Sequence, residues 1–137
     1  MSRVALLPLV AAPVLAVAPA AETATKPAKV LVELREEGGF AGLRNRVAVY
    51  TDGCAVLSRR TGPAVRRCLT AGEWRGLLGS LEHLRLGSSE PPPQGADFIA
   101  YHLAYKGHRA TRYTLPPSWR PVVSRLDKIL VKYGPTG

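Results

Sequence analysis

The chain contains few of the residues that catalysis or metal binding requires. The histidines are His83, His102 and His108, three in 137 residues, and no HExxH motif connects them to a zinc site. No serine stands in a nucleophile-elbow context, and no phosphate-binding glycine motif follows a predicted strand. Glu36 and Glu37 are adjacent, so on a strand they would face opposite ways and form no catalytic pair. These absences predict a protein that is not an enzyme and has no metal or cofactor.

Aromatic and acidic residues are also sparse. Aromatic residues make up 7% of the sequence, and they do not alternate with arginine as a base-stacking surface requires. Against 10 Asp and Glu stand 19 Lys and Arg, which gives a formal net charge of +9. Such a charge favours acidic partners, but no block of five basic residues occurs. The positive charge is therefore compatible either with an acidic partner or with a basic surface that only contacts water. No specific nucleic-acid partner is expected.

The N-terminal apolar stretch is too short for a membrane span. Residues 4–18 are uncharged, but they contain two prolines and fall below the roughly 20 residues that cross a bilayer. With Arg3 before them, and small residues at Ala18 and Ala20, they favour a secretory signal peptide over residues 1–20 rather than an anchor. Its removal lowers Lys and Arg from 19 to 18, a net charge of +8. The expected remainder is a flexible leader (21–29), one domain (30–134) and a short tail (135–137), secreted and without a membrane span.

The two cysteines are placed symmetrically about a turn. Cys54 and Cys68 each lie seven residues from Thr61, in a segment whose Gly62 and following proline indicate a turn. A hairpin centred there sets the two cysteines opposite each other, within bonding distance. In an exported chain this predicts a disulfide rather than two separate buried thiols.

The order of predicted elements indicates an α+β fold. Apolar alternation and turn residues predict strands at 30–35, 46–50, 54–58, 64–68, 98–105 and 108–115, with the last two joined by a turn at Lys106-Gly107. A capping box of Thr70 and Glu73 begins a helix that we expect to end at Gly87. A second helix follows the prolines at 116 and 117 and ends at Gly134. We therefore expect an antiparallel sheet with two helices packed on one face.

Each predicted helix has an apolar face. The residues on these faces recur at helical spacing, so they can be buried only against the sheet or against each other. The predicted helical core is Trp74, Leu77, Leu81, Val122, Leu126 and Ile129.

One glycine-rich segment remains outside this scheme. It comprises Glu36, Glu37, Gly38, Gly39, Phe40, Ala41, Gly42 and Leu43. A large apolar residue on such a loop is costly to leave in water, so Phe40 either folds back over the sheet edge or meets a partner. The amides of its glycines are expected to be free for a partner's backbone.

This segment resembles the opening of the emfourin (protealysin inhibitor) family. The resemblance covers the run 32–43, continues through Asp97 and Phe98 before a hairpin, and closes with Leu115-Pro116 and Pro121 at the last helix. It extends from Val30 to about Leu130, and the order of these motifs carries it. The resemblance implies inhibition of thermolysin-like zinc metallopeptidases by occlusion of their active-site cleft.

The leading hypothesis is thus a secreted metallopeptidase inhibitor. In it, Phe40 fills an apolar pocket of the enzyme, and Glu36 or Glu37 approaches the enzyme's zinc. The alternative is a non-catalytic basic module that binds an anionic envelope component or an acidic protein through its net charge.

Overall fold

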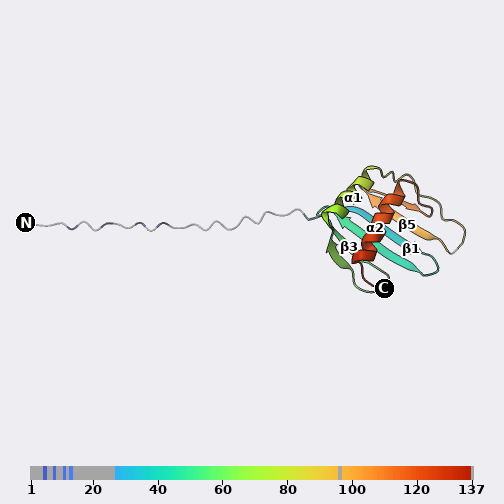
Figure 1. Ribbon diagram of the computed structural model, residues 1–137, viewed down its shortest axis with the longest axis horizontal. Coiled ribbons are helices and arrows are strands. Elements are labelled where there is room, and N and C mark those ends of the chain that lie inside the picture. The colour runs from blue at the N-terminus through green and yellow to red at the C-terminus, as the bar shows by residue number, and fades with distance from the viewer. Residues whose placement is uncertain are drawn as a thin grey trace, which may run out of the picture.

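A six-stranded antiparallel sheet forms the body of the protein (Figure 1). The structure is a computed structural model that describes residues 27–95 and 97–136, with residues 5, 8, 11 and 13 besides. The predicted signal peptide and most of the predicted leader lie outside these ranges. The elements in chain order are β1 (Val30–Gly38), β2 (Leu43–Tyr50), β3 (Cys54–Ser58), β4 (Val65–Cys68), α1 (Ala71–Glu82), β5 (Ile99–Tyr105), β6 (His108–Arg112) and α2 (Trp119–Tyr133). The strands lie side by side in the order β4-β3-β2-β1-β5-β6.

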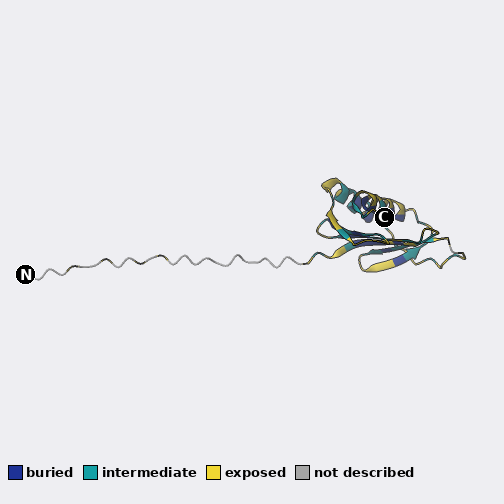
Figure 2. Cartoon of the chain, turned by 90° about the horizontal axis from the view of Figure 1, so that it is seen from below, coloured by how far each residue is buried: buried dark blue, intermediate teal, exposed yellow. Residues whose placement is uncertain are grey.

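Both helices lie on the same side of the sheet (Figure 2). Strand alternation explains which residues they cover. On β1, Val32 and Leu34 are buried in the core, whereas Glu33 and Arg35 belong to the opposite face. There the Glu33 carboxylate pairs with the guanidinium groups of Arg35 and of Arg46 on β2. The predicted α+β class and antiparallel sheet are therefore confirmed.

The first two strands are longer than the sequence indicated. We expected strands at 30–35 and 46–50, but β1 extends to Gly38 and β2 begins at Leu43. Glycines normally weaken strands, yet Gly38 pairs with Leu43 on one side and with Ile99 on the other. Pairing on both sides outweighs the local preference, so the connection shrinks to four residues.

Helix α1 begins as predicted and ends earlier. The Thr70 hydroxyl accepts a bond from the Glu73 amide at 3.1 Å, and the Glu73 carboxylate accepts one from the Thr70 amide at 2.8 Å. The predicted end at Gly87 is wrong because the chain leaves the helix after Glu82. The indole Nε1 of Trp119 donates to the carbonyl oxygens of Arg85 and Leu86 at 3.1 and 3.3 Å, which draws that backbone to α2 instead.

The helical core differs from the prediction at the two tryptophans. Leu77, Leu81, Val122, Leu126 and Ile129 are buried as predicted, but Trp74 is only partly buried. Trp119, which the sequence pattern did not assign to the core, is fully buried. Its indole is tolerated there because Nε1 has the two carbonyl partners described above.

Glu73 also joins the two helices. Its carboxylate accepts a 2.7 Å bond from the Tyr133 hydroxyl and lies 3.2 Å from the Lys132 ammonium. Burial acts to raise the pKa of Glu73, but the bonds from Tyr133, Thr70 and Lys132 outweigh it and lower that pKa to about 2. The capping box therefore fixes the C-terminal end of α2 as well as the start of α1.

Candidate functional site

The connection between β1 and β2 is a tight four-residue hairpin, residues 39–42. The Gly42 amide donates to the Gly39 carbonyl oxygen at 3.1 Å and closes the turn. Gly39 and Gly42 have φ of +74° and +59°, values that side-chain-bearing residues rarely adopt. Phe40 and Ala41 lie between them with negative φ, so the strained positions fall on the glycines.

Phe40 stands at the tip of this hairpin in solvent. Its exposed fraction is 93%, the highest of the large apolar residues described. Of the two alternatives for Phe40, the structure therefore shows no folding back over the sheet edge. A ring this exposed contributes little to the stability of the domain and is available to a partner.

The glycine amides are less free than expected. The Gly39 amide donates to the Phe98 carbonyl oxygen at 3.2 Å, and the Gly42 amide is used within the turn. Gly38 lies in the ladder with φ of +105°, and a Cβ there would approach the Phe98 carbonyl oxygen to 2.6 Å. The amides of Gly39 and Gly42 are thus used within the protein and are not offered to a partner.

The predicted binding segment does not form one loop. Glu36, Glu37 and Gly38 belong to β1, and Leu43 begins β2, so only residues 39–42 are outside the strands. Glu36 is 6% exposed and cannot reach a partner's zinc without unfolding of the strand. Glu37 is half-exposed and lies on the opposite face, with its carboxylate 3.7 Å from Nε2 of His102.

Glu36 is a buried carboxyl group beneath α2. Its pKa is raised to about 8, first because burial removes it from water and second because it lies against Asp127 of α2. The Arg59 guanidinium opposes this rise. Within the described ranges, Glu36 Oε1 has no hydrogen-bond partner. The raised pKa favours the neutral, protonated form of Glu36 at neutral pH, which affects the stability of the fold rather than partner binding.

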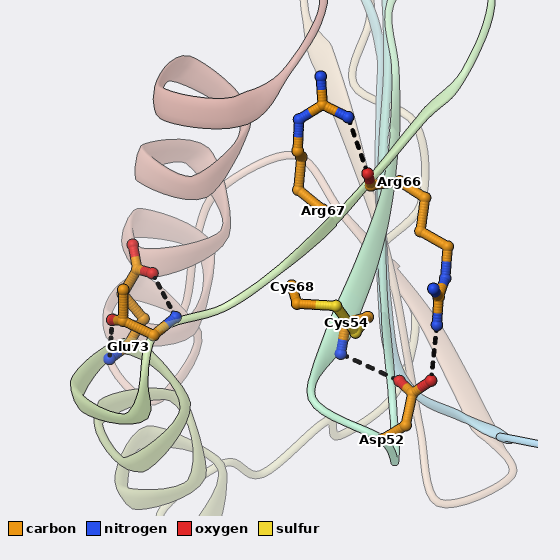
Figure 3. The surroundings of a disulfide bond; sticks show 7 residues. Asp52, Cys54, Arg66, Arg67, Cys68 and Glu73 are labelled. Atoms are coloured by element: carbon orange, nitrogen blue, oxygen red, sulfur yellow. Dashed lines mark hydrogen bonds and ion pairs between the residues drawn. A yellow bond between two sulfur atoms is a disulfide. The ribbon is translucent and has the colours of Figure 1, made fainter.

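The disulfide lies at the other end of the sheet. Cys54 and Cys68 are bonded and pair across β3 and β4, as predicted (Figure 3). Asp52, in the turn before β3, accepts from the Cys54 amide at 3.0 Å and from Arg66 at 2.7 Å. The disulfide thus fixes the base of the β3–β4 hairpin and does not contact the hairpin that carries Phe40.

The three histidines lie apart. His83 caps the C-terminus of α1, His108 begins β6, and His102 on β5 bonds through Nδ1 to the Thr111 hydroxyl at 2.7 Å. Over residues 27–95 and 97–136, no group of three or more His, Cys, Asp or Glu is arranged to hold a metal ion. Nor does the described part of the chain contain a helix long and apolar enough to span a membrane.

The sequence pattern did not reveal that Phe98 lies beside the hairpin. Phe98 immediately precedes β5, and its carbonyl oxygen accepts a hydrogen bond from the amide of Gly39, the residue before Phe40. Only the pairing of β1 with β5, 60 or more residues apart, creates this proximity.

No protein-family model, curated protein or solved structure matches the chain. The resemblance to emfourin therefore rests on the sequence motifs alone.

Proposed function

We propose that the protein is a secreted inhibitor of a thermolysin-like zinc metallopeptidase and acts by inserting the β1–β2 hairpin into the active-site cleft. The observation that carries the proposal is the solvent-exposed Phe40 on a hairpin closed by its own hydrogen bonds. Transfer of a phenylalanine side chain from water into an apolar pocket is worth about 1.5–3 kcal/mol. A preordered loop also loses little conformational entropy on docking.

Secretion forms part of this proposal. The disulfide is consistent with an oxidising compartment, and residues 1–20 have the pattern of a signal peptide. We expect the mass of the exported protein to correspond to a chain that begins at Ala21. A mass that includes residues 1–20 would contradict cleavage at this position.

Some residues of the hairpin are expected to contact the partner, and others maintain the conformation of the hairpin. Phe40 is the side chain expected to enter the partner's pocket, with Ala41 beside it at the tip. Gly38, Gly39 and Gly42 keep the hairpin in shape. Of the two glutamates, Glu37 is the one exposed enough to approach an enzyme-bound zinc ion.

The test is inhibition by the Phe40→Ala variant. Because Phe40 is 93% exposed, the substitution should leave thermal stability nearly unchanged. It should weaken inhibition by about 2 kcal/mol or more, roughly 30-fold, if Phe40 is an interface hot spot. Val131→Ala is the matched control, since Val131 is 77% exposed on α2 and lies outside the hairpin. Equal inhibition by both variants would contradict the proposal.

A second candidate is the binding of an anionic envelope component or acidic protein. The face of the sheet away from the helices supports it, because Arg35 and Arg46 lie opposite each other there. Both guanidinium groups, however, bond to Glu33, at 2.8 and 3.0 Å, which reduces their free charge. Binding driven by this face should weaken steeply with salt, whereas binding through Phe40 should change little.

A further inference from the structure

Both phenylalanines of the chain are exposed, and they lie on segments that touch. The sequence contains two Phe residues. Phe40 is 93% exposed and Phe98 is 45% exposed. Phenylalanine is among the residues most often buried, so leaving both in water at one end of the sheet is unfavourable for an isolated domain. The arrangement indicates a shared contact surface.

The backbone fixes the two residues relative to each other. The Gly39 amide, next to Phe40 in sequence, donates to the carbonyl oxygen of Phe98 itself at 3.2 Å. Gly38 permits this approach, because a Cβ there would come within 2.6 Å of the same oxygen. The Phe98 ring packs over Gly95, where an added Cβ would lie 3.1 Å from the ring. Phe98 is therefore positioned by the same contacts that position the hairpin.

The segment leading to Phe98 is anchored at its start. The Glu90 amide donates to the Thr111 carbonyl oxygen at 2.8 Å. The Glu90 carboxylate accepts from the amides of Tyr113 and Thr114 at 3.2 and 3.3 Å. Three consecutive prolines follow at 91–93 and restrict the backbone further. The backbone of residues 90–93 thus has little conformational freedom left to lose when this surface is covered.

We propose that Phe98 is a second apolar contact with the metallopeptidase and occupies a separate pocket of the same cleft as Phe40. This inference rests on the proposed function of the hairpin. Two exposed rings on two segments that touch at one end of the sheet fit a partner with two neighbouring apolar pockets. An endopeptidase cleft, which binds an extended substrate in successive pockets, has that form. Phe98 then contributes to which peptidase is inhibited, since two fixed contacts discriminate between clefts better than one.

The test compares the inhibition constants of Phe98→Ala, Phe40→Ala and Val131→Ala on the mature domain with a thermolysin-like peptidase. We expect Phe98→Ala to raise the constant at least tenfold, and Val131→Ala less than twofold. Because Phe98 is half-buried, Phe98→Gln is measured in parallel. This variant keeps a long side chain and replaces the ring with a polar amide. If the alanine variant does not fold, a tenfold rise in the inhibition constant of Phe98→Gln is the result expected instead.

The outcomes separate the two proposals. If Phe40→Ala weakens inhibition and the folded Phe98 variant changes it less than twofold, the second contact is refuted and the proposed function stands. If the wild-type domain inhibits none of these enzymes, both proposals fail. Loss of inhibition with both phenylalanine variants, at unchanged melting temperature for the variant assayed, supports the two-pocket surface.

Discussion

Replacement of Glu36 by glutamine should remove a pH-dependent loss of stability. The ordinary pKa of the carboxyl is 4.5 and its folded value is about 8. Below pH 4.5 the group is protonated in both the folded and unfolded states. Between pH 4.5 and 8 only the folded protein retains the proton, so the free energy of unfolding falls as the pH rises. Above pH 8 the carboxylate is charged and buried, and its contribution is lost.

The size of this effect follows from the interval between the two values. An interval of about 3.5 pH units at about 1.4 kcal/mol per unit gives at most about 5 kcal/mol. Asp127 adds to the rise in the Glu36 pKa, and Arg59 and Tyr101 face the same carboxyl from other parts of the chain. Because the structure relaxes around a buried charge once it forms, we expect roughly half of that figure, about 2–3 kcal/mol.

The assay is urea unfolding at a series of pH values from 5 to 9. The wild-type free energy of unfolding should fall across this range by about 2–3 kcal/mol more than that of Glu36→Gln, which stays uncharged. Glu37→Gln is the matched control, because it removes a half-exposed carboxyl on the other face of the same strand. If wild type and Glu36→Gln lose stability in parallel, the carboxyl is not held protonated beneath α2.

The remaining predictions concern the framework of the domain. Leu81→Ala should lower the free energy of unfolding by about 2–5 kcal/mol, since Leu81 is buried between α1 and the sheet; a change within about 0.5 kcal/mol in urea unfolding would contradict its burial. Thiol titration of the denatured, unreduced protein should find no free thiol, and reduction of the 54–68 bond should cost about 3 kcal/mol. Gly38→Ala should destabilise the domain by more than 1 kcal/mol, because φ is +105° and the added Cβ meets a backbone oxygen; an unchanged melting temperature would refute that reason.

Local patterns predicted those parts of the fold that depend on nearby residues. The capping box of α1 joins residues three apart, and the turn at Lys106-Gly107 needs two residues with positive φ, observed at 51° and 76°. The Cys54–Cys68 pair likewise follows from symmetry about one turn. In each case the partner lies within one hairpin or one helical turn.

The sequence patterns did not predict features that depend on contacts between residues far apart in the chain. The end of α1 depends on Trp119, which bonds a backbone 33 and 34 residues earlier. Alternation places Glu36 on the helix-covered face only once β1 is known to continue to Gly38, and its position against Asp127 depends on where α2 packs. The proximity of Phe98 to the hairpin depends on the pairing of β1 with β5. The candidate site was thus located by sequence at Phe40, while its neighbours and its limits required the structure.

The proposed inhibition is tested most directly by steady-state kinetics of a thermolysin-like peptidase with a short peptide substrate and increasing amounts of the mature domain. Insertion of the hairpin into the cleft excludes substrate, so the domain should raise the apparent KM and leave kcat unchanged. Raising the substrate concentration should restore activity, and Phe40→Ala should be a weaker competitive inhibitor than Val131→Ala. A lowered kcat at constant KM, or full activity at every concentration of the domain, would contradict occlusion of the active site by Phe40.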